Sequence, residues 1–286
     1  LKRASVFRDK MMKEKVVPED YRAWLGKVKR ETLMLPVPAV NVPVKIRISE
    51  ALDRTDQCPV HVNMHGGGFV FPQSEDDDLF CAHVAAGIRG IVVDIDYASA
   101  FDHPFPTAFE QCYEVVRWVF SKCADWHADP AKVSAGGQSA GGELTAAIAL
   151  RSAAAGDFRL CLQILEYAAI ENYQTVLEGG NERSRAFSLY YCDGDVRVLQ
   201  SPYVSPVYAT DAMLAGQPPI LIINGGLCPF KKVNEEYGLR LAALGTEVTI
   251  KSFMKSHHGF TVRLTDEWRE SQELIIRSIS KAGPED

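Results

Sequence analysis

The chain alternates short apolar runs with helical stretches, and this alternation constrains its fold more than any other feature. Six apolar runs begin near residues 60, 90, 132, 160, 219 and 247. Stretches with a period of 3.6 residues lie between most of them, at 79–88, 107–123, 140–154 and 232–244. A strand followed by a helix, repeated in this way, predicts a mostly parallel sheet with helices on both faces. Two further strand-like runs, from Thr32 and from Val42, precede these elements.

Composition excludes several other classes of protein. With 286 residues and 47% hydrophobic side chains, the chain can bury one large core without metals or disulfides. A net charge of -6 with no dense basic block argues against binding of nucleic acid or an anionic membrane, and favours a small neutral or cationic partner. The longest uncharged stretch, 212–230, contains turn signals and is no membrane span. The N-terminus shows no signal-like apolar region, so we expect a cytoplasmic protein.

The rhythm of strands and helices divides the chain into three regions. Residues 1–30 have two short amphipathic helical patterns, which we interpret as N-terminal cap helices. Residues 31–170 and 217–286 form the predicted α/β core. Residues 171–216 are aromatic, polar and rich in turns, and we interpret them as a cap insertion that packs with the N-terminal helices as a lid.

A Gly-x-Ser-x-Gly pattern around Ser139 joins an apolar strand to a helix. Gly137 and Gly141 allow a sharp turn that exposes the Ser139 hydroxyl in a strained conformation. The helix start behind it favours developing negative charge. A phosphate-binding turn is the alternative, but the Lys-[Ser/Thr] and Gly-x-Gly-x-x-Gly signatures of such turns are missing from the sequence here. Ser139 is therefore a candidate nucleophile.

A second glycine-rich turn follows the strand that begins near residue 60, in the run His65-Gly-Gly-Gly-Phe. Consecutive glycines let backbone N–H groups approach an oxygen closely, as an oxyanion hole requires. We assign this role to the N–H groups of Gly67, Gly68 and Ala140, with His65 as a structural residue that orients the loop. A glycine-rich loop is a weak signal alone and a stronger one beside the serine turn.

A general base has to come from a loop at the same edge of the sheet. The pair His257 and His258 follows the last strand, where the chain order of serine, acid and histidine in α/β-hydrolases places the base. Two histidines in a loop are otherwise more often a solvated surface feature. The serine turn favours the catalytic interpretation.

Together these motifs resemble the hormone-sensitive-lipase-like family of α/β-hydrolases, the bacterial short-chain esterases with an HGGG motif. The resemblance runs from about residue 40 to 280 and rests on six motifs: His65-Gly-Gly-Gly-Phe, Asp96-Tyr97 with His103-Pro-Phe-Pro, Ala128-Asp-Pro, Gly137-Gln-Ser-Ala-Gly-Gly, Pro218-Pro219 and His258-Gly-Phe. It implies an α/β-hydrolase fold with a mostly parallel eight-stranded sheet and a helical cap. It also implies hydrolysis of short to medium acyl esters without a cofactor or metal, and selects His258 as the base.

The resemblance also implies an acid after the strand that begins near residue 219, but Cys228 stands there in Gly226-Leu-Cys-Pro-Phe. A thiol is mostly neutral at pH 7 and orients a histidine poorly unless the imidazolium lowers its pKa. Glu171, or Glu166, is the alternative acid if the loops bring it to His258. Further departures are Gln138 before the serine and Ala168 after Tyr167.

The other six cysteines, at positions 58, 81, 112, 123, 161 and 192, show no metal-binding or redox spacing. We expect them to be small buried hydrophobes in a reducing compartment.

Two functions from different classes remain. The first is a serine carboxylesterase acting through an acyl-enzyme, impaired to the extent that Cys228 fails as the acid. The second is a non-hydrolytic protein that binds a small apolar ligand on the same scaffold, as plant hormone receptors of similar fold do. Intact Ser139 and His258 favour the first, and Cys228 favours the second. The expected partner is a small ester or apolar ligand, with a homodimer left open.

Overall fold

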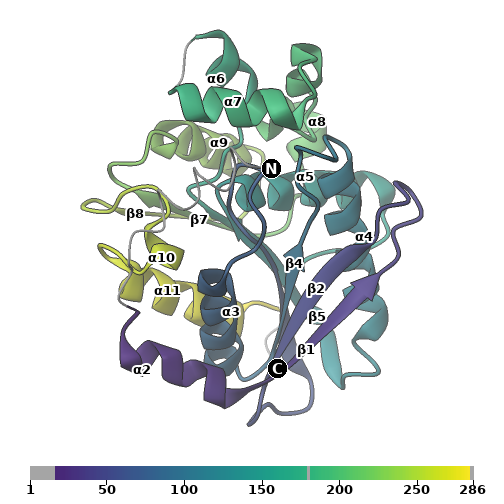
Figure 1. The fold of residues 1–286 in the computed structure, drawn as a ribbon, viewed down its shortest axis with the longest axis vertical. Helices are drawn as coiled ribbons and strands as arrows, with labels where there is room; N and C mark the ends of the chain where they lie inside the picture. Colours follow the sequence, from purple (N-terminus) through teal and green to yellow (C-terminus); the bar gives the residue numbers. More distant parts are fainter. Residues whose placement is uncertain (1–16, 179–180, 284–286) are drawn as a thin grey trace.

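A computed structural model describes residues 17–178 and 181–283, and its centre is one eight-stranded sheet (Figure 1). The strands lie in the order β1-β2-β4-β3-β5-β6-β7-β8. Their bounds are β1 Val28–Leu35, β2 Val44–Ala51, β3 Cys58–Met64, β4 Ile91–Asp96, β5 Ala128–Gln138, β6 Leu162–Glu166, β7 Ile220–Gly225 and β8 Val248–Phe253. The expected α/β architecture and its eight strands are confirmed.

The direction of the strands decides where side chains can gather. Strands β3 to β8 are parallel to one another, whereas β2 is antiparallel to β4 and β1 is antiparallel to β2. The carboxyl ends of β3, β5, β7 and β8 therefore reach one edge of the sheet.

Helices cover both faces of the sheet, which is why its central strands are apolar throughout. Helices α3 (Glu75–Ile88) and α11 (Trp268–Lys281) pack together on one face. Helices α4 (Thr107–Lys122), α5 (Ala140–Ala155) and α9 (Lys231–Ala243) build the cores on the other face. All residues of β6 and β7 are buried between these layers.

Residues 171–178 and 181–216 form short helices and turns that lie together above the sheet in Figure 1. The elements are α6 Tyr173–Leu177, α7 Glu182–Tyr191, η2 Val196–Gln200, η3 Pro206–Tyr208 and α8 Asp211–Leu214. A buried hydrogen bond fixes helix α7 to the segment before α6, since the Ser188 hydroxyl donates to Asn172 Oδ1 at 3.0 Å.

The described part of the N-terminal region packs beside helix α3 (Figure 1). Helix α2 (Glu19–Arg22) and the turn η1 (Ala23–Lys27) contact α3 and lie far from α6 and α7 (Figure 1). The Tyr21 hydroxyl donates to Gln272 of α11 at 2.9 Å. These elements therefore do not pack with residues 171–216 as expected, and residues 28–30 begin β1 instead of ending a cap helix. The expectation for residues 1–16 lies outside the described residues.

Within residues 17–178 and 181–283, no helix has the length and apolar character needed to cross a bilayer.

Candidate active site

Ser139 lies at the turn between β5 and α5, with a φ of 55° and a ψ of -110°. This strained conformation depends on two glycines that flank the serine. A Cβ atom on Gly141 would lie 1.8 Å from the carbonyl oxygen of Met64, and one on Gly137 would lie 2.4 Å from the same oxygen. The turn is thus pressed against the end of β3, and only glycine fits at either position.

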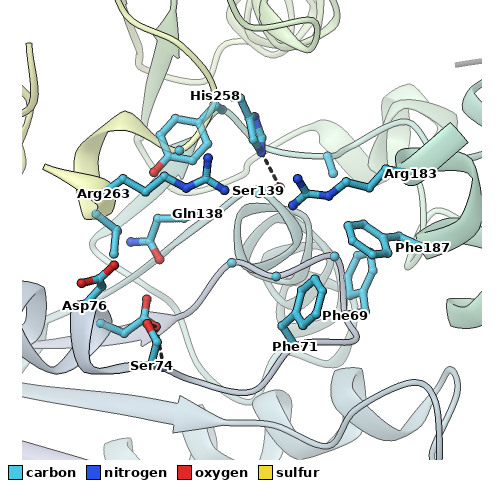
Figure 2. Close-up of a pocket in the computed structure, with 18 of the residues that line it drawn as sticks. Phe69, Phe71, Ser74, Asp76, Gln138, Ser139, Arg183, Phe187, His258 and Arg263 are labelled. Carbon is cyan, nitrogen blue, oxygen red and sulfur yellow. Dashed lines mark hydrogen bonds between the residues drawn. The ribbon is translucent and has the colours of Figure 1, made fainter. Parts of the chain in front are cut away.

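His258 reaches Ser139 from the loop between β8 and α10 (Phe260–Arg263). Its Nε2 atom lies 3.0 Å from Ser139 Oγ (Figure 2). The neighbouring His257 is exposed and contacts Asp266 Oδ2 through Nδ1 at 3.2 Å. Of the two loop histidines, His258 is therefore the one in contact with the serine.

Cys228 occupies the other side of the His258 ring. Its Sγ atom lies 3.2 Å from His258 Nδ1, in the turn after β7, and only 5% of the residue is exposed. Burial raises the pKa of the Cys228 thiol to about 11. At neutral pH the group facing Nδ1 is accordingly an uncharged thiol.

The two alternative acids lie elsewhere. Glu171 accepts hydrogen bonds from the N–H groups of Gln174 and Thr175, at 2.7 and 3.0 Å, and so caps the start of α6. Glu166 accepts from the Gln138 side chain at 2.8 Å beneath the serine turn, and burial raises its pKa to about 7. The structure brings neither carboxylate to His258, which leaves Cys228 at the acid position.

The glycine-rich loop after β3 holds the glycines that were predicted to form an oxyanion hole. Gly67 and Gly68 have φ values of 133° and 62°, which side chains rarely tolerate. Among backbone bonds between described residues, neither glycine N–H is a donor. The Ala140 N–H belongs to the first turn of α5 and has no acceptor within that helix. His65 supports the loop, stacking on Tyr97 with 4.1 Å between ring centres.

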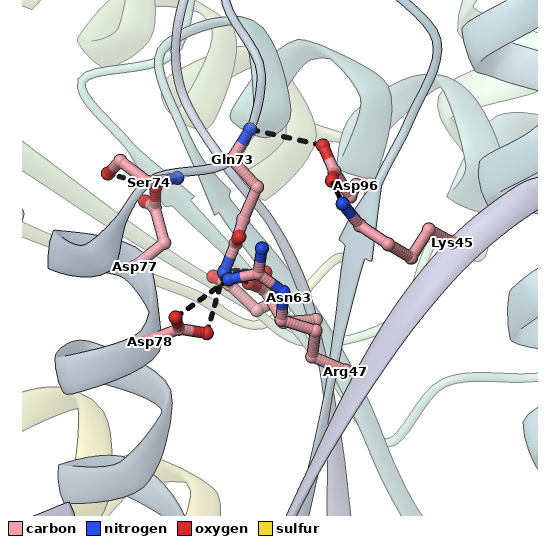
Figure 3. A network of polar contacts seen from close by, with 9 residues as sticks. Lys45, Arg47, Asn63, Gln73, Ser74, Asp77, Asp78 and Asp96 are labelled. Carbon is pink, nitrogen blue, oxygen red and sulfur yellow. Dashed lines mark hydrogen bonds and ion pairs between the residues drawn. The ribbon is translucent and has the colours of Figure 1, made fainter. Parts of the chain in front are cut away.

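A polar network fixes this loop where it continues towards α3 (Figure 3). The Gln73 side chain donates to Asp94 at 2.7 Å and to Asp78 at 2.9 Å, and its N–H donates to Asp96 at 3.2 Å. Asp78 and Asp96 in turn pair with Arg47 and Lys45 of β2. The loop is therefore tied to β2 and β4 beside the core, so that Gly67 and Gly68 stay in place.

Ser139 and His258 open into a cavity of about 960 Å³. Its walls come from the glycine-rich loop, the start of α3, helix α7 and the residues after His258. Phe187 of α7 packs closely against Gly68. A Cβ atom added to Gly68 would lie 2.1 Å from the Phe187 ring. Residues 171–216 thus contribute directly to the wall of the cavity.

Three arginines line this cavity, and two of them lie beside Ser139 and His258 (Figure 2) although the sequence predicted no role for either. Arg183 of α7 and Arg263 of α10 both line it, and Figure 2 shows their guanidinium groups directed towards Ser139 and His258 from different sides. Isolated arginines in helices carry no motif, so the sequence offered no signal for them. Burial, followed by the charges of Arg263 and Arg183, lowers the pKa of His258 to about 3.

In the described part of the chain, no group of three or more His, Cys, Asp or Glu side chains could hold a metal ion.

Comparison with known proteins gives a consistent result. The family model described as the α/β-hydrolase fold matches residues 61–262. Esterase LipI of Mycobacterium tuberculosis is 31% identical over 238 residues, 80% of this chain and 73% of that protein. Human hormone-sensitive lipase is 34% identical over 114 residues, 38% of this chain and 11% of that protein. The crystal structure of carboxyl esterase 2 from Tuber melanosporum, 26% identical, matches with a TM-score of 0.82 over 90% of this chain and 88% of that one.

Proposed function

Because the chain belongs to the hormone-sensitive-lipase-like esterase family of the α/β-hydrolases, we propose that it is a serine carboxylesterase in which Cys228 stands in for the acid of the triad. The observation that carries this proposal is the line of contacts from Ser139 Oγ through the His258 ring to Cys228 Sγ, at 3.0 and 3.2 Å. The comparisons favour a hydrolase over the ligand-binding alternative.

In the proposed reaction Ser139 Oγ attacks the acyl carbonyl carbon while His258 Nε2 accepts its proton. The N–H groups of Gly67, Gly68 and Ala140 stabilise the tetrahedral oxyanion. The C–O bond to the alcohol then breaks, and His258 returns the proton to the leaving oxygen. Water, deprotonated by His258, hydrolyses the acyl-enzyme and regenerates Ser139. Residues 171–216 act as the cap that shields these steps.

Cys228 weakens one step of this cycle. An aspartate only accepts hydrogen bonds, so it holds the proton on Nδ1 and leaves Nε2 free to act as base. A neutral thiol can also donate to Nδ1, which places the ring proton on Nε2 and removes the base. It also offers no negative charge to the imidazolium. We therefore expect slow but measurable turnover.

The test is steady-state hydrolysis of short 4-nitrophenyl esters by the wild type, Ser139→Ala, Cys228→Asp and Cys228→Asn. We expect wild-type kcat above the Ser139→Ala level and a large increase in Cys228→Asp. Disabling the acid of a serine-protease triad costs about 10⁴-fold in kcat, which sets the upper limit for the gain. Cys228→Asn has the shape of the aspartate without its charge and is expected to show no such gain. Wild-type turnover equal to that of Ser139→Ala would sink the proposal.

A further inference from the structure

Arg183 and Arg263 have no acidic partner among the described residues, unlike Arg22, the third arginine that lines the cavity. Arg47, Arg151 and Arg240 pair with Asp78, Glu110 and Asp211 at 2.7 to 2.8 Å. Across residues 17–178 and 181–283, neither Arg183 nor Arg263 forms an ion pair or a side-chain hydrogen bond with an acidic residue.

The acidic residues that line the same cavity are engaged at the start of α3. Glu75 pairs with Arg22 at 2.9 Å, and Asp77 accepts the Ser74 N–H at 2.8 Å as part of a capping box. Asp76 has an interaction of its own. Glu75 and Asp77 thus direct their carboxylates to partners other than Arg183 and Arg263.

The two arginines repel each other electrostatically. Arg183 is half-buried, and its pKa is lowered by burial and then by the charge of Arg263. Its guanidinium lies 5.2 Å from the centre of the Phe187 ring, which fixes it beside the glycine-rich loop. Arg263 is exposed at the mouth of the cavity, near Gly259. An oxyanion between the two groups would remove this repulsion and accept hydrogen bonds from both.

The same anion would supply what the triad lacks. During catalysis His258 becomes an imidazolium beside two positive charges, and the neutral thiol of Cys228 does not compensate it. A negative charge on the substrate would neutralise the arginines and so lower the energy of the imidazolium.

We propose that Arg183 and Arg263 form an anion-binding subsite, and that the enzyme acts preferentially on esters that carry a second, oxyanionic group such as a carboxylate. The inference rests on the proposed esterase function and names its substrate class. It differs from the neutral or cationic partner that the net charge of the whole chain favours, because the guanidinium groups of Arg183 and Arg263 are directed towards Ser139 and His258 inside the cavity (Figure 2).

The experiment compares mono-4-nitrophenyl adipate with methyl 4-nitrophenyl adipate, which differ in one charge and one methyl group. We expect kcat/KM for the anionic ester to be higher by about tenfold or more, the size of a charged hydrogen bond. The preference should disappear in Arg183→Gln/Arg263→Gln and persist in part in the double lysine variant. Arg277→Gln removes an exposed arginine of α11 that does not line the cavity, and it should leave the preference intact.

The possible results test the anion-binding subsite separately from the proposed esterase activity. Equal kcat/KM values for both esters, with turnover above Ser139→Ala, would overturn the anion subsite and leave the esterase standing. If neither ester is turned over, calorimetry of adipate binding to Ser139→Ala decides the matter. Binding that is lost with the two glutamine substitutions supports the subsite, and no binding overturns it. Competition by inorganic phosphate at constant ionic strength shows whether the subsite distinguishes carboxylate from phosphate.

Discussion

At the scale of single residues, His258 stands in an environment opposite to that of a usual triad histidine. A carboxylate would raise its pKa, whereas burial and two arginines lower it to about 3. The ring is therefore neutral, and able to act as a base, far below the pH at which an ordinary histidine with a pKa near 6.5 becomes protonated. Its basicity is correspondingly weak, which adds to the effect of Cys228.

This environment predicts an unusual pH profile. For methyl 4-nitrophenyl adipate, kcat/KM should stay level from pH 8 down to about pH 5, since activity is lost only as the pH falls through the lowered pKa of His258. In Cys228→Asp the acid limb should move to higher pH, because the new carboxylate favours the imidazolium. The profile is measured after a check that the protein stays folded at each pH. A wild-type limb centred near 6.5 would contradict the account.

Residues differ in how far the sequence reveals them. Ser139, His258 and the glycines could be predicted because they belong to recognisable sequence motifs. Backbone strain and close packing restrict which residues fit at these positions. Cys228 could be located because the motif around it is otherwise preserved. Arg183 and Arg263 come together only through the fold, from segments 80 positions apart, and no local rule links them.

At the scale of elements, the contact between the serine turn and the end of β3 holds the site together. The Met64 carbonyl lies against both Gly137 and Gly141, so the turn that carries Ser139 and the glycine-rich loop share one support. Any extra atom there displaces backbone, which cannot move aside as a flexible side chain can.

We therefore expect Gly141→Ala to destabilise the protein by about 3 kcal/mol or more and to reduce kcat/KM by about 10². Gly26→Ala is the matched control, since no atom lies within 4 Å of the added Cβ. It should change the free energy of unfolding by less than about 0.5 kcal/mol and leave turnover unaltered. Urea unfolding and ester hydrolysis give the two readouts. A Gly141→Ala protein as stable as Gly26→Ala would show that the turn is not packed in this way.

A helix or strand could be predicted from the sequence when its own hydrophobic pattern was enough to define it. The buried strands and long helices have clear periodicity, and their positions followed from the sequence. The short helices α2 and η1 did not reveal their partner, because an amphipathic stripe shows that a helix packs and not against what. The hydrogen bond between Tyr21 and Gln272 identifies the partner, but the two residues lie far apart in the sequence.

At the scale of the whole molecule, a parallel sheet gathers residues from four strand ends at one edge, and the helices of residues 171–216 enclose them. The α/β-hydrolase fold supplies this geometry, and the relatives named esterases share it. In this chain the cavity combines a thiol at the acid position with two arginines that have no acidic partner among the described residues (Figure 2).

The central claim, that Ser139 is a nucleophile activated by His258, is tested most directly by covalent labelling. The protein is incubated with diethyl 4-nitrophenyl phosphate, and the adduct is located by peptide mass spectrometry. The account predicts release of one equivalent of 4-nitrophenol and a diethyl phosphoryl group on Ser139, with no label in Ser139→Ala and slower labelling in His258→Ala. A folded wild-type protein that remains unlabelled at Ser139 after prolonged incubation, or that is labelled equally when His258 is removed, would contradict it.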